Sequence, residues 1–346
     1  MSKAAELAAL IGSQTALSNR NMIINGAMTV AQRGTASAAS GYGCVDRWKN
    51  QFSGGGVTQS QEDLSSSDTP YSYGFRKTLK LLNTSNSTAT SAFAQIVQVI
   101  EAQNVACSGW NYTTSSSHIT VQFWVKSSLA GTYYVSLVTS DGTGKSYSFE
   151  FTLVADTWKK VTHTFPGDSS ITINNDNGNG LQLYIVPHYG TNFTTSGHTD
   201  EAWQTYSNAD ITGDYAQNWR NSSNATFFVT GVQLEVGETA TPFEHEDYGT
   251  TLRKCQRYCF TQARYGDGSV GENAAGSTRI HCARYSSSGS FVTYQFPVMM
   301  RVKPDLTFSA TGGASSANYS NAGHVHLFDG DDVDWNVYDL IGEAEL

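Results

Sequence analysis

Charged side chains are scarce in this sequence, and basic residues are fewer than acidic ones. Asp, Glu, Lys and Arg account for 15% of the 346 residues, whereas soluble domains usually carry about 25%. There are 21 Lys and Arg against 30 Asp and Glu, and the formal net charge is -9. Binding to nucleic-acid phosphates needs clustered basic side chains, so we expect no nucleic-acid partner.

Cysteine is also scarce. The chain has five cysteines, an odd number, and none of them stand in a C-x-x-C spacing. A disulfide scaffold or a zinc module is therefore not expected. We interpret these residues as buried thiols of a protein that is made in a reducing cytoplasm. They are Cys44, Cys107, Cys255, Cys259 and Cys282.

Long apolar runs are missing as well. No segment approaches the roughly 20 apolar residues that cross a bilayer, so we expect no membrane insertion. The N-terminal segment as far as Ile11 also lacks the basic region and the long apolar core of a secretory signal. Export by that route is therefore not expected.

What the sequence has in abundance is uncharged polarity, supplied by Ser, Thr, Asn and Gly. Within it, apolar and polar residues alternate along residues 119–126, 147–153 and 232–236, although Trp124 breaks the polar face of the first segment. Such alternation predicts antiparallel strands with one buried face. Turn-forming residues punctuate the pattern, as at residues 174–180. Many short strands of this kind favour a mainly β fold, an antiparallel β-sandwich of the jelly-roll type.

The pattern changes near residue 248. Tyr248, Leu252, Cys255 and Cys259 recur at helical spacing along one stripe, and strand patterns return after residue 260. Beyond Lys303 the chain holds eight acids and no basic residue, which predicts a solvated, acidic end. The predicted units are residues 1–19, an N-terminal helical segment; 20–247, the sandwich; 248–260, a connecting helix; and 261–346, a smaller C-terminal β domain.

Three blocks of sequence resemble a known family. In their order along the chain they resemble the structural proteins of bacteriophage tail fibres and related virion appendages, especially those of marine phages. The resemblance spans roughly residues 19 to 260, and a weaker likeness to fibre tips follows at residues 296–304. The blocks are residues 19–28 with 31–34 and 45–48, residues 230–237 with 240–245, and residues 252–258.

The resemblance implies a structural component of a phage virion that acts by assembly and by attachment to the host surface. It further implies a homotrimer, other tail or capsid proteins of the virion as partners, a host-surface glycan as receptor, and assembly in the bacterial cytoplasm before incorporation into the virion. Two alternatives stay open. One is a carbohydrate-binding module that decorates the capsid, and the other is a glycan-degrading enzyme.

The N-terminal segment is a candidate for virion attachment. Leu7, Leu10 and Ile11 fall on one face of a short helix. A lone helix of this length is marginal in water, so we expect it to order against something. Its own domain is one candidate, and the resemblance implies the virion or a coiled contact between subunits as another.

Aromatic residues interleaved with short polar ones concentrate between residues 188 and 219. Flat aromatic faces can stack on sugar rings while neighbouring polar side chains bind the hydroxyls, and long loops on a rigid sandwich often carry recognition. Covering the end of the sandwich, or forming a subunit interface, would explain the same composition. The predicted glycan-binding residues are Tyr189, Trp203, Tyr206, Tyr215 and Trp219.

A pair of histidines is the one candidate metal site. His324 and His326 are alternate residues of a predicted strand and should point to the same side. Repeated by three chains around a threefold axis, as some phage fibre tips are arranged, the pair would supply six imidazoles to a transition metal. Two simply exposed histidines are the alternative. No other cofactor is expected.

Motifs for catalysis are missing from the sequence. It holds neither the serine elbow of hydrolases nor a His-Glu-x-x-His helix. Asp200, Glu201, Asp210 and Asp214 could supply a carboxylate pair for sugar cleavage, but acids in loops are usually just solvated. We therefore expect a binding protein and not an enzyme.

Overall fold

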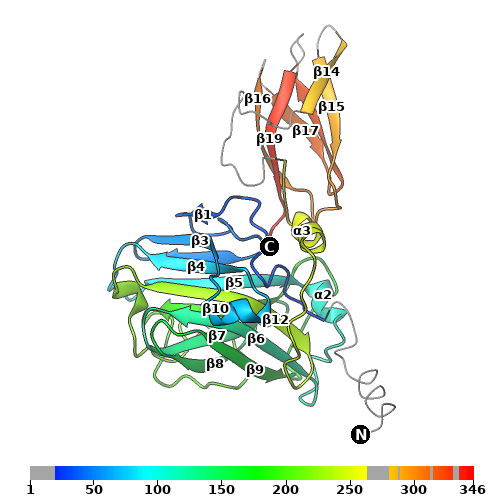
Figure 1. The fold of residues 1–346 in the computed structure, drawn as a ribbon. Helices are drawn as coiled ribbons and strands as arrows, with labels where there is room; N and C mark the ends of the chain where they lie inside the picture. Colours follow the sequence, from blue (N-terminus) through cyan, green and yellow to red (C-terminus); the bar gives the residue numbers. More distant parts are fainter. Residues whose placement is uncertain (1–19, 263–279, 287–288, 312–314, 330–334) are drawn as a thin grey trace, which may run out of the picture. The chain divides into compact units, whose positions relative to one another are not determined.

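The computed structural model describes residues 20–262, 280–286, 289–311, 315–329 and 335–346 (Figure 1). The chain divides into two compact units. The first runs up to Thr29 and continues over Ala36–Glu246, and the second combines Val30–Thr35 with Asp247–Leu346. Among the described residues, none of the helices has the length and apolar character needed to span a bilayer.

The first unit is built from two six-stranded antiparallel sheets, which stack face to face (Figure 1). One sheet has the order β1 (Ala36–Ser37), β3 (Val57–Asp63), β4 (Lys77–Asn83), β12 (Thr226–Val236), β6 (His118–Ser127) and β9 (Lys159–Pro166). The other has the order β11 (Gln204–Thr205), β8 (Lys145–Leu153), β7 (Gly131–Thr139), β10 (Asn179–Tyr189), β5 (Phe93–Glu101) and β2 (Lys49–Ser53). Because most connections cross from one sheet to the other, the predicted jelly-roll sandwich is confirmed.

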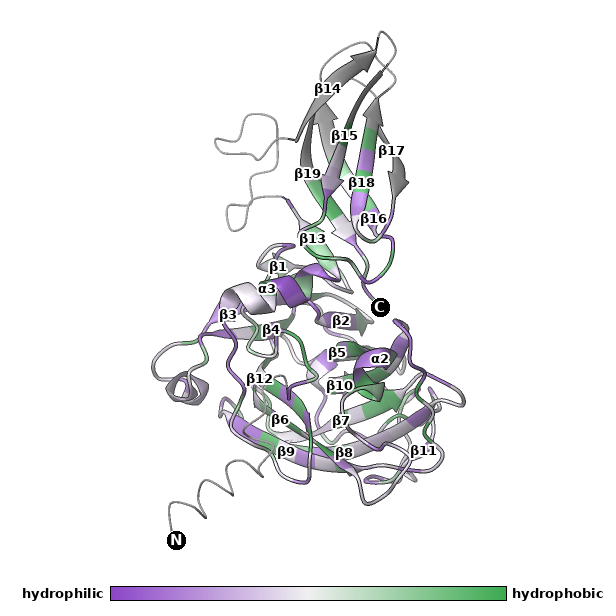
Figure 2. Ribbon diagram, turned by 90° about the vertical axis from the view of Figure 1, so that its right-hand side faces the viewer, coloured by the Kyte–Doolittle hydropathy of each residue, from purple (hydrophilic) through white to green (hydrophobic). Residues whose placement is uncertain are grey.

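Alternation along the strands builds the core between the sheets, as the hydropathy colouring of Figure 2 illustrates. In β8, Tyr147, Phe149 and Phe151 are buried in the main core, whereas Glu150 and Thr152 are exposed. The local period of two therefore fixes which face of the strand is buried. Short helical turns complete the unit: η2 (Thr69–Tyr73), α2 (Ala102–Ala106) and η3 (Trp219–Asn221).

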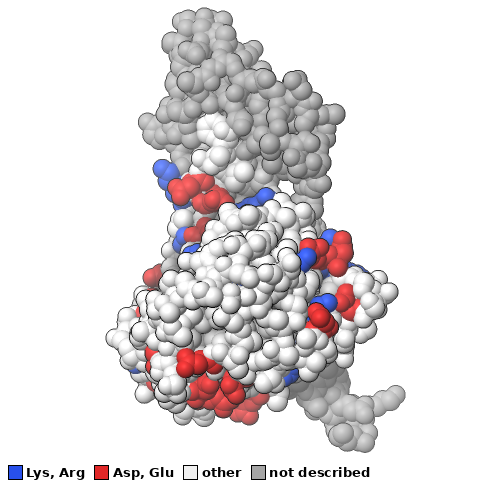
Figure 3. Space-filling view, turned by 90° about the vertical axis from the view of Figure 1, so that its left-hand side faces the viewer, with Lys and Arg blue, Asp and Glu red and all other residues white. Residues whose placement is uncertain are grey.

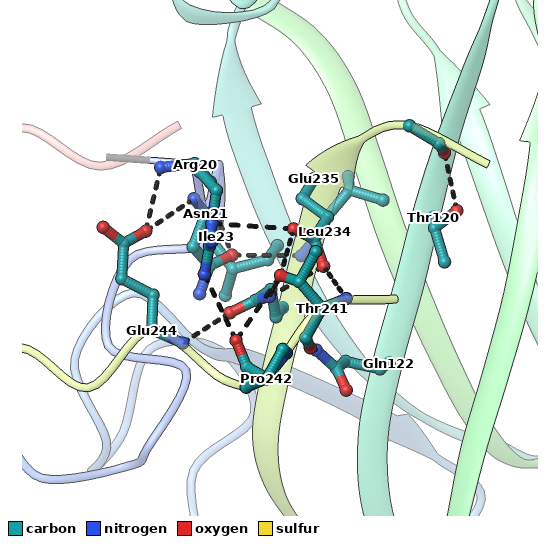
Figure 4. A network of polar contacts seen from close by, with 12 residues as sticks. Arg20, Asn21, Ile23, Thr120, Gln122, Leu234, Glu235, Thr241, Pro242 and Glu244 are labelled. Atoms are coloured by element: carbon teal, nitrogen blue, oxygen red, sulfur yellow. Dashed lines mark hydrogen bonds and ion pairs between the residues drawn. The ribbon is translucent and has the colours of Figure 1, made fainter. Parts of the chain in front are cut away.

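The first residues of the described chain fasten onto β12. Asn21 accepts hydrogen bonds at Oδ1 from the backbone N–H groups of Ile23 and Leu234, each at 3.0 Å, and its Nδ2 donates to the Val232 carbonyl at 3.2 Å. One Glu244 carboxylate oxygen accepts from the backbone N–H groups of Arg20 at 2.8 Å and Asn21 at 3.1 Å (Figure 4). We call this set of contacts, together with Glu235 and Thr241 described next, the N-terminal clasp.

Glu235 shows why the clasp matters for the sandwich. Because Glu235 alternates with Val232 and Leu234, we expect its side chain on the solvent-exposed face of the strand, yet Glu235 is only 1% exposed. Its carboxylate accepts hydrogen bonds from Thr241, at 2.8 Å from the backbone N–H and 2.6 Å from the hydroxyl, and lies 3.7 Å from Nε of Arg20. A buried carboxylate needs such partners. Two of the sequence blocks that carry the family resemblance thus meet here and hold each other in place.

The second unit contains helix α3 (Tyr248–Gln256) and a seven-stranded sheet. Asp247 caps the helix by accepting from the backbone N–H of Thr250. The helix is shorter than predicted, because Cys259 lies in β13 instead of on the helical stripe. The strands are β13 (Cys259–Thr261), β14 (Ile280–Ser286), β15 (Gly289–Gln295), β16 (Asp305–Thr311), β17 (Ser315–Ser320), β18 (His324–Asp329) and β19 (Trp335–Glu343), with β19 pairing with β13, β14 and β16.

The second unit also takes up a segment from the N-terminal part of the chain. The Gln32 side chain donates to the Cys259 carbonyl at 2.7 Å. Arg33 lies 2.7 Å from Glu343 and 3.2 Å from Glu345, and its side chain is only 9% exposed. The acidic end of the chain is therefore not wholly solvated as predicted, since two of its carboxylates hold this arginine.

Three of the four cysteines whose side chains the structure describes follow the prediction of buried thiols. Cys44, Cys255 and Cys259 are buried, and burial raises the pKa of Cys44 to about 12. Cys107 is exposed, so for this residue the prediction is wrong. It directly follows the short helix α2, where the backbone closes the helix by donating to the Gln103 carbonyl.

Candidate functional site

Two of the five predicted glycan-binding aromatics are core residues. Trp219 is completely buried, and its indole N–H donates to the Thr226 carbonyl at 3.3 Å. Tyr189 is 3% exposed, and its hydroxyl donates to the Gln95 side chain. Trp219 offers no ring face to a ligand, so for this residue the prediction is wrong, because the turn at η3 carries its ring into the interior. The Tyr189 ring is buried at the end of β10, and this residue lines a second cavity described below.

The other three aromatics lie in different surroundings. Trp203 packs against the main core, and its indole N–H donates to the Pro166 carbonyl at 2.7 Å. Tyr206 and Tyr215 pack on a smaller cluster around Val186, and the Tyr215 ring lies 5.0 Å from that of Tyr134. The three rings thus do not form one stacking platform. Tyr206 and Tyr215 thus serve in packing on β10 of the second sheet.

A Ser-His-Asp arrangement holds the loop that follows β10. The Nε2 atom of His198 lies 2.5 Å from the Ser148 hydroxyl, and its Nδ1 lies 2.7 Å from a carboxylate oxygen of Asp210. These are the partners of a hydrolase triad. Ser148, however, is 1% exposed, and its hydroxyl donates to Asp200 at 2.8 Å, so it is not an accessible nucleophile. Asp200 and Asp210, considered above for sugar cleavage, are both engaged by this network.

An aromatic cleft lies elsewhere on the first unit, beside β6 and β12. Its volume is about 480 Å³. One feature of the sequence points to it, since Trp124 interrupts the polar face of β6. We define the aromatic cleft by its lining residues Tyr73, Phe75, Gln122, Trp124, Lys160, Gly231, Ala240, Thr241, Pro242, Phe243 and His245.

Tyr73 forms the exposed edge of the aromatic cleft. It ends η2 and is followed by Gly74, whose positive φ of 94° closes the turn. Its side chain is 57% exposed, and its ring lies 5.0 Å from the ring of Trp124 at an interplanar angle of 45°. Two aromatic rings therefore stand side by side at the surface, one exposed and one nearly buried.

Asp68 anchors the turn that presents Tyr73. Its carboxylate accepts from the indole N–H of Trp158 at 2.7 Å and from the backbone N–H of Ser65 at 2.9 Å, and it lies 3.3 Å from the Lys126 ammonium. Partial burial acts to raise the pKa of Asp68, but the hydrogen bonds from Trp158 and Ser65 outweigh it and lower this pKa to about 2. Asp68 is thus a stable anion at neutral pH.

The opposite wall of the cleft is a packed group of rings. Phe75 contacts Phe243 edge to face at 4.8 Å, and His245 lies 5.1 Å from Phe75. Gly231 makes room for this packing, since a Cβ there would come within 2.6 Å of the Phe75 ring. The His245 Nε2 atom lies 3.0 Å from the Tyr73 carbonyl, which accepts its hydrogen. The histidine therefore links this wall to the turn that carries Tyr73.

The N-terminal clasp positions the segment that closes the cleft. Glu235 binds Thr241, the Gln122 side chain donates to the Thr241 carbonyl, and the Glu244 backbone N–H donates to the Gln233 side chain at 2.8 Å (Figure 4). Residues 240–245 are thus held from both sides. The aromatic cleft is formed by the fold itself and does not need a ligand to assemble it.

The charge around the cleft is one-sided. Lys160 lines it, and no lining residue is a carboxylate. On the face of the first unit that Figure 3 shows, most of the surface carries no charge and the acidic side chains gather in patches. Chemically, the cleft combines an exposed aromatic edge, an imidazole and an ammonium group, which suits a flat, polar ligand with an apolar face.

The two histidines predicted to bind a metal do lie together. The rings of His324 and His326 are 4.8 Å apart, and a Thr293 hydroxyl lies 2.7 Å from Nδ1 of His326. Among the described residues, no group of three or more His, Cys, Asp and Glu side chains is arranged for a metal. A metal shared between chains stays a prediction. The predicted attachment residues Leu7, Leu10 and Ile11 lie outside the described residues.

Comparison with known proteins brings only distant likenesses. No family model matches the sequence, and no curated protein matches it. Among solved structures, the enzymatically active domain of tailspike protein 4 of bacteriophage CBA120 is similar at 12% identity and a TM-score of 0.35, over 63% of this chain and 22% of that one. A CBM4 structure is similar at 12% identity and a TM-score of 0.31, over 62% of this chain and 98% of the other.

A third similar structure is the family 11 carbohydrate-binding module of the cellulase Lic26A-Cel5E of Clostridium thermocellum. It shares 13% identity with this chain, with a TM-score of 0.30, over 60% of this chain and 98% of the module. All three TM-scores lie below 0.5, so these likenesses carry no conclusion about function. The fold and the site by themselves define a jelly-roll protein with a preformed aromatic cleft on its surface.

Proposed function

We propose that this protein binds a glycan through the aromatic cleft, as a structural component of a phage tail fibre or related virion appendage. The observation that carries the binding proposal is the exposed ring of Tyr73, held 5.0 Å from Trp124 at the edge of a cleft of about 480 Å³. Small-ligand sites are typically concave, of about 300–1,000 Å³, and lined by aromatic residues with a few polar groups. A sugar ring has the matching apolar face and polar rim.

Rigidity supports binding at this cleft. Asp68 fixes the turn before Tyr73, and the clasp fixes the segment around Thr241. A ligand therefore does not have to order either wall, and ordering is one of the main free-energy costs of association. An exposed aromatic ring on a fixed support can give its full contact area to the ligand.

The charge of the cleft favours an acidic glycan. Lys160 brings a positive charge, and the lining residues bring no negative one. A sugar that carries a carboxylate or a sulfate would gain a charge-assisted hydrogen bond there. The proposed ligand class is therefore an acidic polysaccharide of the kind found on cell surfaces.

The phage part of the proposal is supported by the sequence resemblance. It includes a homotrimeric state, contact with other virion proteins, location in the virion, and action by attachment without catalysis. The buried Ser148 is in keeping with this, since the one Ser-His-Asp arrangement described has no exposed nucleophile.

The binding proposal is tested with immobilised polysaccharides, both acidic and neutral, followed by titration calorimetry with oligogalacturonate. We expect Tyr73→Ala and Lys160→Gln each to weaken binding of the acidic oligomer by about tenfold. Tyr248→Ala is the matched control, because Tyr248 is also an exposed aromatic, at 43%, and does not line the cleft. Unchanged binding by Tyr73→Ala, or no binding to any acidic polysaccharide, would contradict the proposal.

A further inference from the structure

A second cavity, of about 390 Å³, lies among the loops of the first unit. Three segments enclose it: the loop between β4 and β5, the end of β10 with the residues that follow, and the segment before η3. We call it the loop cavity. Its lining residues are Ser87, Thr88, Ala89, Thr90, His188, Tyr189, Gly190, Thr191, Thr194, Asp214, Tyr215, Ala216, Gln217 and Asn218.

Backbone hydrogen bonds join the first two segments. The Gly190 N–H donates to the Ala92 carbonyl at 2.8 Å, and the Asn192 N–H donates to the Thr90 carbonyl at 3.0 Å. Gly190 is required at this approach, since a Cβ there would come within 2.3 Å of the Thr90 oxygen. The two segments therefore form one continuous wall.

The third segment is fastened by side chains. Buried Gln217 donates to the Pro187 carbonyl at 3.0 Å and accepts from the Trp219 N–H at 2.7 Å. Across the cavity, the Thr194 hydroxyl donates to Asp214 at 2.6 Å. The loop cavity is thus preformed, as small-ligand sites usually are.

His188 gives the cavity an uncharged hydrogen-bonding group. The residue is 8% exposed, and burial, with a smaller effect of Arg220, lowers the pKa of His188 to about 4. Its ring is therefore neutral at pH 7. The Nδ1 atom has no hydrogen-bond partner in the described chain, which is unusual for a buried polar atom.

The chemistry of the lining selects the ligand class. Five of the lining residues are Ser or Thr, one is a carboxylate, and none is Lys or Arg. A phosphate, sulfate or carboxylate ligand would meet only the negative charge of Asp214, whereas a ligand rich in hydroxyls can both donate to that carboxylate and accept from the threonines. We infer that the loop cavity binds an uncharged sugar unit, at a site separate from the aromatic cleft and opposite to it in charge preference.

The test uses the full chain and a panel of uncharged methyl glycosides, with glucuronate as the anionic comparison. Saturation-transfer NMR and calorimetric titration report binding. We expect a neutral glycoside to bind, Asp214→Asn to weaken this binding several-fold, and Thr191→Trp, which places a bulky ring at the exposed rim of the cavity, to abolish it. An unchanged melting temperature of Thr191→Trp checks that the variant is folded.

Tyr73→Ala separates this inference from the proposed function. If the cavity is the site, Tyr73→Ala binds the neutral glycoside as the parent does, whatever happens to the acidic oligomer. Equal binding by Thr191→Trp and the parent, glucuronate binding as tight as that of the neutral glycosides, or no binding of any neutral glycoside would overturn the inference. Loss of acidic-oligomer binding in Thr191→Trp would mean that cavity and cleft are not separate sites.

Discussion

His198 and Asp210 are joined within the loop that covers the second sheet, with 2.7 Å between Nδ1 and the carboxylate oxygen. The other ring nitrogen lies 2.5 Å from the hydroxyl of Ser148, on β8. The His198 side chain is 2% exposed. One buried imidazole therefore ties two points of a long loop to a strand, in an arrangement that resembles a catalytic triad and acts as an anchor.

Replacing His198 by Gln should destabilise the first unit by roughly 1–3 kcal/mol, because it leaves buried hydrogen-bonding groups unpaired. Urea denaturation followed by tryptophan fluorescence would measure this. His118→Gln is the matched control, since His118 pairs with the largely exposed Glu238 and such pairs contribute less than about 1 kcal/mol. Equal stability of the two variants would contradict the anchoring role.

Asp68 makes the support of Tyr73 sensitive to acid. The pKa of this carboxyl is about 2 in the folded chain, below the ordinary value of 3.8. The folded state therefore holds the anion more strongly, and this contribution to stability is present above about pH 3.8 and lost as the pH falls towards 2.

We expect Asp68→Asn to lower the melting temperature at pH 7. Between pH 4 and pH 2, the melting temperature of this variant should fall less than that of the parent protein. The same variant should weaken oligogalacturonate binding at pH 7, because the turn before Tyr73 loses its anchor. Thermal unfolding at a series of pH values measures the first effect. A variant that reproduces the parent's acid profile would show that Asp68 is not responsible.

Asn21 should be among the most sensitive positions of the clasp. Its side chain makes three hydrogen bonds, of which two, with Val232 and Leu234, join the start of the sandwich to β12 and one, from Ile23, holds the local turn. We expect Asn21→Ala to lower the free energy of unfolding by about 2–3 kcal/mol. Asn208→Ala, at an exposed loop position, should stay within about 0.5 kcal/mol of the parent. If Asn21→Ala is as stable as this control, the clasp does not hold the sandwich closed.

The assembly state is open to direct measurement. Light scattering on the purified chain should give three times the monomer mass of 37.5 kDa if the protein is a trimeric appendage component. A clean monomer that still binds glycan would instead favour the capsid-decoration module. For a trimer, adding a chelator and repeating the measurement tests whether a metal at His324 and His326 holds the chains together.

The sandwich could be predicted because its signal is local. Tyr147, Phe149 and Phe151 alternate with polar residues, and a period of two specifies a half-buried strand wherever it occurs. The burial of Glu235 could not be predicted from this period of two. Its pattern is that of an exposed position, and only the return of Thr241 over the strand covers it.

The aromatic cleft could be predicted only in part. Trp124 is noticeable in the sequence because it interrupts a polar face. Its partner Tyr73 lies far away in the sequence, at the end of a single helical turn that brings its ring to Trp124. Conversely, Trp219 and Tyr189 lie in a stretch rich in polar residues and were therefore predicted to contact a glycan, although the chain buries both rings in the interior. Composition locates aromatic residues but does not tell which way they face.

The six residues from Val30 to Thr35 have a consequence for how such a gene can change. They precede most of the sandwich in the sequence, yet they belong to the C-terminal unit, where Arg33 meets Glu343 and Glu345. A recombination event that exchanged only the 3′ end of the gene would separate the arginine from both of its carboxylates. The gene segments that encode Val30–Thr35 and Glu343–Glu345 are therefore expected to be inherited together when such genes recombine.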